Sequence, residues 1–167
     1  ATLRRRAKDA ERELFNLGIT FTVYTDRDAI DRILPFDVIP RILSPKDWNH
    51  INTGIQQRVA ALNLFLKDIY NDGKVFRDGI IPEELVKDNK HYRPEMEGFV
   101  PPQGTYVHIC GTDLVRDEKG QFLVLEDNAR IPSGVSYVIE NRHLMMRAFS
   151  DLAEGIQLAD VDDYGRQ

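Results

Sequence analysis

The chain has 167 residues, of which 42% are hydrophobic and 29% are charged, so its length and composition fit one globular domain with a hydrophobic core. A formal net charge of −5 argues against sequence-independent binding to nucleic acid, and a single cysteine, Cys110, excludes an intrachain disulfide. No apolar run is long enough to cross a membrane, so we expect a cytoplasmic protein without a membrane partner.

The N-terminal part predicts a helix, a strand and a connecting segment. Apolar residues recur at helical spacing over residues 3–17, and Gly18 suits the position just after a helix. Residues 19–25 form a β-branched and aromatic run that is typical of a strand. Residues 31–44 contain two prolines, which favour an extended, packed connection. Because the first residue is Ala1 and the helix is already under way, we expect the chain to be cut from a longer protein.

A long amphipathic helix is predicted between Ser44 and Gly73. Ser44 is suited to cap the helix, Pro45 to its first position, and Asp47 to the acidic position of a capping box. Its apolar face is formed by Trp48, Ile51, Ile55, Val59, Leu62, Leu66 and Ile69. This helix is expected to cover a sheet or another helix, with Arg58 on or near the solvated face.

Shorter elements follow this helix. Asp78 and Gly79 indicate a turn, and Pro82 is suited to the start of a short helix. Residues 90–104 contain three prolines and predict a loop, which could be either a plain connection or a functional lid. Residues 134–149 predict a helix, and the weakly periodic residues 154–167 could fray.

A β-hairpin is the most informative prediction. Residues 105–117 and 121–132 are rich in β-forming side chains and are joined by a tight turn at Glu118, Lys119 and Gly120. Together the elements predict an α+β fold in which this antiparallel hairpin packs with long amphipathic helices.

Oxygen-bearing side chains at the end of the second hairpin strand suggest a metal site. Side chains alternate along a strand, so Glu126 and Asn128 share one face and Asp127 points to the other. Carboxylate and amide oxygens are the ligands that Mg²⁺ prefers. A two- or four-residue turn would add Asp113 to this face and place Gly111 opposite Glu126, whereas a three-residue turn would put Asp113 on the other face. A solvated strand end is the alternative.

The residues after this strand could bind an anion. Arg130 could neutralise a phosphate carried by the metal, or it could form an ion pair with Asp127 or Glu126. Ser133 and Gly134 lie at the start of the predicted helix, whose free N–H groups favour an anion. Ordinary helix capping by a serine is the alternative there.

Several segments, taken together, resemble one family. The stretches PFDVIPRILS, GIQQRVAALNLFLKDIY, RPEMEG and YVHICGTDLVRDEKGQFLVLEDNARIPSGVSYVIENRHLMM are similar to the circularly permuted ATP-grasp proteins. These are uncharacterised proteins and proposed carboxylate–amine ligases, distantly related to glutathionylspermidine synthetase. The resemblance implies that Asp113, Glu126 and Asn128 hold the Mg²⁺ ions of ATP. It also implies that Arg130 is a catalytic residue, which stabilises the transferred phosphoryl group or acyl phosphate.

The resemblance also implies a reaction. ATP would phosphorylate a substrate carboxylate, and an amine would displace phosphate from the acyl phosphate to form an amide, with small molecules or peptides as substrates. Residues 1–167 would then be a single domain, the N-terminal, metal-binding part of the protein, with the nucleotide-binding part downstream. On its own this part is expected to bind Mg·ATP weakly and to catalyse nothing. The alternative is a non-catalytic binding or scaffold domain, and the sequence does not indicate an oligomeric state.

Overall fold

The computed structural model describes residues 2–24 and 28–166, and these residues combine helices with two-stranded antiparallel sheets. The predicted α+β class is therefore confirmed. The contacts group the chain into two compact units, one made of residues 1–42 and 134–167 and the other of residues 43–133. The assignment of residues 1–167 to one domain stays a prediction. No helix in the described part of the chain is long and apolar enough to span a membrane.

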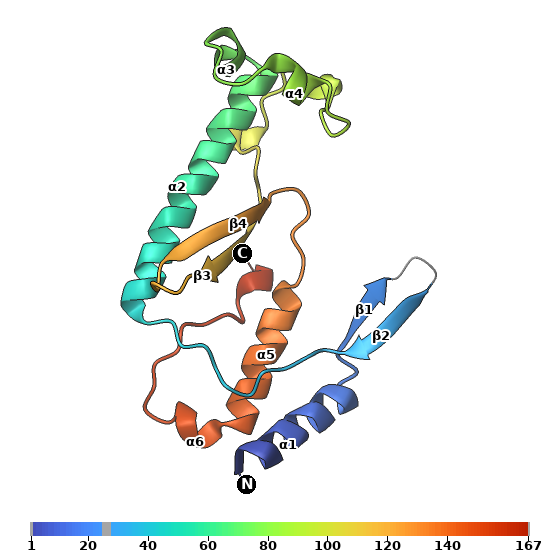
Figure 1. Cartoon of the computed structure of the whole chain (residues 1–167), viewed down its shortest axis with the longest axis vertical. Helices are drawn as coiled ribbons and strands as arrows, with labels where there is room; N and C mark the ends of the chain where they lie inside the picture. The colour runs from blue at the N-terminus through green and yellow to red at the C-terminus, as the bar shows by residue number, and fades with distance from the viewer. Residues whose placement is uncertain (1, 25–27, 167) are drawn as a thin grey trace. The chain divides into compact units, whose positions relative to one another are not determined.

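The first unit contains α1, the β1–β2 hairpin and α5 (Figure 1). The predicted N-terminal helix, first strand and late helix are all confirmed, and Gly18 follows α1 with a positive φ of 65°. The elements of this unit are α1 (Thr2–Asn16), β1 (Thr20–Tyr24), β2 (Ala29–Ile33), α5 (Val135–Ala148), α6 (Ser150–Ala153) and the 3-10 turn η3 (Tyr164–Arg166).

Strand β2 corrects the prediction that the extended connection begins at Asp31. Residues 31–33 belong to β2, which pairs antiparallel with β1. All five β2 residues are exposed, so this strand has no buried face. A half-buried strand is recognised in a sequence by strict alternation of apolar and polar residues, and this segment lacks that alternation. The backbone hydrogen bonds to β1 define this strand, and such bonds can form whatever the side chains are.

The core of the first unit lies where α1 contacts α5. Leu14 and Leu144 are completely or almost completely buried, as is Ala10. Ile19, Phe36 and Val38 pack around them, so the proline-containing connection packs as expected at Phe36 and Val38, whereas Ile39 and Ile42 farther along it are exposed. Arg147 on α5 forms an ion pair with Glu13 on α1 at 3.1 Å, at the edge of this core.

The second unit is built on the predicted long helix, α2 (Pro45–Tyr70). Ser44 caps it as predicted, because its Oγ accepts a hydrogen bond from the Asp47 N–H at 3.1 Å. The short helix predicted at Pro82 is also confirmed, whereas α3 was not predicted. The other elements of this unit are α3 (Lys74–Arg77), α4 (Glu83–Lys87), the 3-10 turns η1 (Pro94–Met96) and η2 (Pro102–Gly104), β3 (Gly111–Arg116) and β4 (Phe122–Asn128).

The segment before β3 is bonded to α2 rather than paired in the sheet. Asn63 on α2 accepts hydrogen bonds through its Oδ1 from the N–H groups of Tyr106, at 2.7 Å, and Val107, at 2.9 Å. Its Nδ2 donates to the carbonyl of Val59 at 3.0 Å. The first hairpin strand therefore begins at Gly111, and the prediction that it begins near residue 105 is wrong.

Candidate functional site

The hairpin turn has three residues between Asp117 and Gln121. The Asp117 N–H donates to the Gln121 carbonyl at 2.9 Å, and the Asp117 carboxylate accepts from the N–H groups of Lys119 and Gln121. Gly120 completes the turn with a positive φ of 78°. By itself, such a turn would place Asp113 and Glu126 on opposite faces of the hairpin.

A β-bulge at Leu125 reverses this outcome. Leu114 pairs with Val124, but Asp113 pairs with Glu126, so Leu125 has no partner across the ladder. Asp113 and Glu126 are therefore directly opposed and share a face. The expected pairing of Gly111 with Glu126 is wrong, since Gly111 lies opposite Asn128.

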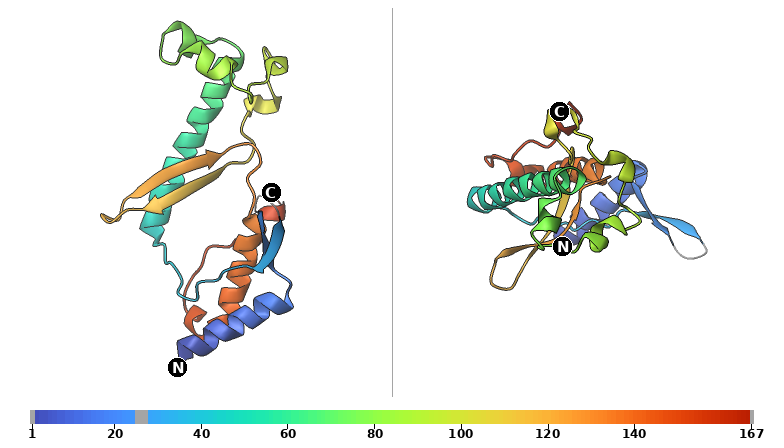
Figure 2. Two further views of the ribbon diagram at one scale, coloured as in Figure 1. Left: turned by 45° about the vertical axis from the view of Figure 1, so that its right-hand side comes forward. Right: turned by 90° about the horizontal axis from the view of Figure 1, so that it is seen from above.

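The bulge also exchanges the faces of the residues nearer the turn. Unbroken alternation would put Phe122 and Val124 on the face of Glu126, but the bulge puts them on the other face. That other face lies toward α2 (Figures 1 and 2), because Arg116 contacts both the Phe122 ring, 5.1 Å away, and Asp47 of α2, at 3.8 Å.

The face of the hairpin opposite to Phe122 and Asp127 carries the predicted metal ligands. Asp113, Glu126 and Asn128 are all exposed. Within residues 2–24 and 28–166, neither carboxylate forms an ion pair with a basic side chain. Asn128 donates from Nδ2 to the carbonyl of Ile131 at 3.4 Å, so its Oδ1 is the atom left for a cation. In the described residues no group of three acidic, histidine or cysteine side chains could hold a metal, so the predicted site would depend on the Asn128 oxygen as its third donor.

Asp127 lies on the opposite face, as the alternation of side chains predicts. Its Oδ2 accepts from Nε of Arg58 on α2 at 2.6 Å, and its Oδ1 accepts from Oγ1 of Thr112 at 2.9 Å. Only 11% of the Asp127 side chain is exposed. Sequence reasoning placed Arg58 on or near the solvated face, and no signal in the sequence paired it with a residue 69 positions away.

Gly111 brings the segment after β4 close to the hairpin. A Cβ atom at Gly111 would lie 3.0 Å from the Cβ of Pro132, closer than two carbons pack. The glycine therefore lets the chain fold back across β3 directly after Asn128. Within the described residues, Arg130 in this segment forms no ion pair, so it is not paired with Asp127 or Glu126.

A groove of about 600 Å³ lies beside the end of β4 in the second unit. It is lined by Glu126, Asn128 and Arg130 together with four apolar or aromatic residues. The lining residues are Leu66, Tyr70, Tyr106, Glu126, Asp127, Asn128, Ala129 and Arg130.

The predicted anion site at the start of α5 remains a prediction. Gly134 caps α5 with a positive φ of 93°, and no side chain bonds to the first turn, so Ser133 does not cap this helix. The N–H groups of that first turn have no helical partner and favour an anion. Ser133 and Gly134 are neighbours in the chain but belong to different units.

Comparison with known proteins decides the family. A sequence model described as "A circularly permuted ATPgrasp" matches residues 40–167, which is more than half of the chain. The chain belongs to the circularly permuted ATP-grasp family. This confirms the resemblance, and ATP-grasp proteins in general use ATP together with divalent metal ions.

The chain is similar to proteins of Synechocystis, Mycobacterium and Frankia. An uncharacterized protein of Synechocystis sp. is 46% identical over 99% of this chain, and one of Mycobacterium leprae is 43% identical over 97%. A Frankia casuarinae protein named "Putative glutamate--cysteine ligase 2-2" is 40% identical over 96% of the chain. The chain spans 34%, 28% and 18% of the lengths of these three relatives.

Proposed function

We propose that the chain supplies the metal ligands of an ATP-dependent carboxylate–amine ligase. The observation that carries this proposal is the direct opposition of Asp113 and Glu126 across the β3–β4 ladder. Like charges in directly opposed positions destabilise a strand pair, whereas a divalent cation between the two carboxylates would make the arrangement favourable. Asn128 adds a neutral oxygen on the same face, and this donor set of two carboxylates and an amide suits Mg²⁺.

The family and the charged side chains near β4 support a reaction that proceeds through an acyl phosphate. Mg·ATP would supply the phosphoryl group, which the substrate carboxylate takes up as an acyl phosphate with release of ADP. An amine nitrogen then attacks the acyl carbon, the C–O bond to phosphate breaks, and the amine proton leaves to solvent. Arg130 would act as the catalytic cation on the transferred group, where negative charge develops.

Ser133 and Gly134 would contribute to phosphate binding through the free N–H groups at the start of α5. In this proposal Arg130, Ser133 and Gly134 contact phosphate oxygens, and Asp113, Glu126 and Asn128 contact the metal.

The substrate class is supported by the name of one relative. A glutamate–cysteine ligase joins a carboxylate to an amine, and the Frankia protein that carries this name is 40% identical to the chain. We therefore propose small-molecule or peptide carboxylates and amines as substrates of the whole protein, in the cytoplasm. A non-catalytic scaffold with the same fold is the alternative, and it would bind metal or nucleotide without turnover.

Metal binding is tested directly on this chain. We expect Mn²⁺, added with and without ATP, to broaden the amide signals of residues 111–113 and 126–130 in an NMR titration. Glu126→Gln should remove this localised response, because it removes one of the two carboxylate charges. Glu118→Gln is the matched control, since Glu118 is an exposed acid at the turn of the same hairpin. Equal responses from wild type and Glu126→Gln would refute the metal site.

Turnover is tested in a full-length protein that contains this chain. ATP consumption is measured with panels of carboxylates and amines, and Glu126→Gln should lower kcat at least about 100-fold, since metal and phosphate contacts supply much of the stabilisation in phosphoryl transfer. Unchanged kcat in Glu126→Gln would contradict the mechanism. Binding of Mg·ATP without turnover for any pair would favour the scaffold alternative.

A further inference from the structure

We propose that Arg58 is a positioning residue, which acts through Asp127 to set the geometry of Asp113, Glu126 and Asn128. The functional part of this inference rests on the proposed metal role of those three residues. Nothing in the family assignment gives a role to Arg58 or to Asp127.

The contacts form a clamp of three side chains, Arg58, Asp127 and Thr112, which we call the α2 clamp. Both carboxylate oxygens of Asp127 are used, Oδ2 by Arg58 at 2.6 Å and Oδ1 by Thr112 at 2.9 Å. The Asp127 side chain is 11% exposed and that of Arg58 is 45% exposed. Asp127 is thus held on the α2 side of the hairpin by two different elements.

The clamp acts on the metal ligands through the backbone of both strands. Asp127 is the residue between Glu126 and Asn128, so holding its side chain toward α2 turns its two neighbours outward. Thr112 is the ladder partner of Asp127 and stands next to Asp113. The bond between them therefore fixes the two strands at the point where Asp113 and Glu126 face each other.

The bulge explains why the hairpin needs this support. Leu125, directly before Glu126, has no ladder partner, and a bulge locally disrupts pairing and bends the strand. The ladder from the turn is therefore interrupted directly before Glu126 and resumes for three residue pairs only, from Asp113–Glu126 to Gly111–Asn128. The α2 clamp adds a side-chain contact to this short paired segment.

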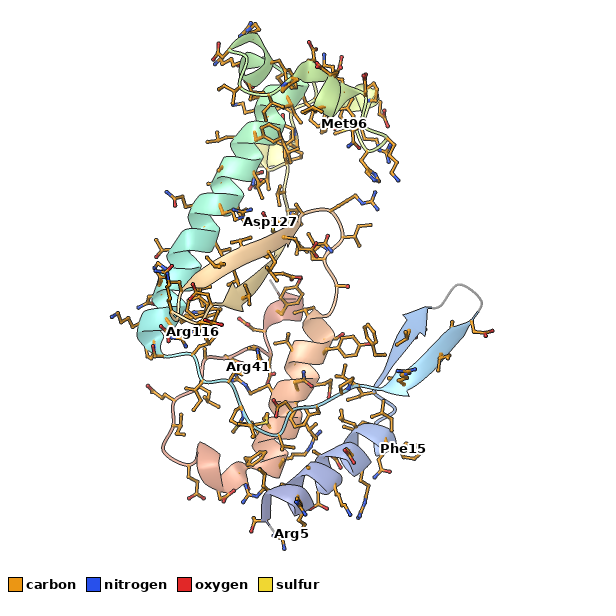
Figure 3. The ribbon with its side chains drawn as sticks, viewed as in Figure 1. Arg5, Phe15, Arg41, Met96, Arg116 and Asp127 are labelled. Carbon is orange, nitrogen blue, oxygen red and sulfur yellow. The ribbon has the colours of Figure 1, made fainter. Side chains whose placement is uncertain are left out.

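A second ion pair supplies a matched control. Arg116 at the turn end of the hairpin forms an ion pair with Asp47 of α2 at 3.8 Å, so it too joins the hairpin to this helix. Figure 3 labels Asp127 and Arg116 near opposite ends of the hairpin. A purely structural role for Arg58 would give Arg58→Gln and Arg116→Gln similar effects at the ligands, whereas a positioning role confines the effect to Arg58→Gln.

The experiment compares wild type, Arg58→Gln, Arg58→Lys and Arg116→Gln in the whole chain. The first readout is the Kd for Mn²⁺ from the amide signals of residues 111–113 and 126–128. Loss of a group that is hydrogen-bonded to a metal ligand typically weakens metal binding about 10- to 100-fold. Arg58 acts less directly, through Asp127, so we expect about 10-fold for Arg58→Gln, the lower end of that range. Arg116→Gln should leave the Kd unchanged. Arg58→Lys should recover part of the loss, since an ammonium can still donate to Asp127.

The second readout needs no metal and separates this proposal from the proposed function. In metal-free protein, Arg58→Gln should shift the amide signals of Asp113, Glu126 and Asn128 more than Arg116→Gln does. Equal or absent shifts in the two variants overturn the positioning role, as does an unchanged Kd in Arg58→Gln. If wild type ignores the metal while these shifts occur, the metal assignment fails and the positioning of the three side chains stands. Thermal unfolding of each variant confirms that the comparison is made on folded protein.

Discussion

Asn63 gives the sharpest test of how the second unit holds its hairpin. Its Oδ1 accepts two backbone hydrogen bonds, from Tyr106 at 2.7 Å and from Val107 at 2.9 Å. Val107 is only 4% exposed, so its N–H cannot turn to water when the acceptor is removed. Asn63→Ala deletes this acceptor and leaves both N–H groups without a partner.

The expected cost follows from these contacts. Each lost hydrogen bond costs about 1 kcal/mol, and an unpaired buried N–H raises the cost further, so we expect a loss of about 2–4 kcal/mol. The assay is equilibrium urea unfolding, combined with hydrogen exchange of the Tyr106 and Val107 amides. In Asn63→Ala, the exchange rates of the Tyr106 and Val107 amides should rise more, relative to wild type, than those of other amides in the unit, because these two amides lose their hydrogen-bond acceptor.

Two controls separate the acceptor from other effects of the substitution. Asn63→Asp keeps an oxygen acceptor and loses only the donation to Val59, so it should preserve most of the protection of the two amides. Asn52→Ala, at an exposed asparagine of the same helix, measures the gain in helix propensity, about 0.5 kcal/mol. Unchanged exchange at Tyr106 and Val107 in Asn63→Ala would show that the side chain does not anchor this segment.

Three substitutions elsewhere in the second unit give further tests. Gly111→Ala should destabilise by about 1–3 kcal/mol and shift the amides of residues 129–133, because its Cβ would lie 3.0 Å from that of Pro132; normal stability and signals would exclude the close approach. Gly54→Ala, in α2 with no atom within 4 Å of the new Cβ, should stabilise by about 0.5–1 kcal/mol in urea unfolding, and a loss of stability would contradict the open space found there. Burial, followed by the hydrogen bond to Glu97, raises the pKa of Tyr92 from 10.0 to about 12. Since the folded state then holds its proton more tightly, Tyr92 contributes stability that is complete below pH 10.0 and is lost as the pH rises through about 12. The unfolding free energy of wild type should fall relative to that of Tyr92→Phe over this range, and parallel curves would refute the shift.

The long helix and the hairpin turn were predictable because their signals are local. Ser44 caps α2 through a contact three residues away, and Asp117 organises the turn through bonds to residues two and four positions later. Local signals failed for β2, whose exposed residues carry no alternation, and for the segment before β3, where the N–H groups of Tyr106 and Val107 bond to a side chain far away in the sequence.

The sequence by itself determined which residues could form the candidate site. Alternation along the strand separates Glu126 and Asn128 from Asp127, and this holds because neighbouring side chains on an extended backbone point to opposite faces. Whether Asp113 lies on the face of Glu126 and Asn128 depends on the pairing register of the hairpin. The three-residue turn, taken alone, predicts the opposite face for Asp113.

Only the tertiary structure decided the register and what supports it. The unpaired Leu125 moves Asp113 opposite Glu126, and Arg58 of α2 binds Asp127 behind the ligands. Both features depend on how distant segments pack, since a bulge is set by the balance of contacts on both faces of a hairpin and an ion pair by the approach of two elements. Neither the bulge nor the ion pair leaves a periodic pattern in the chain, and for that reason the sequence predicts neither of them.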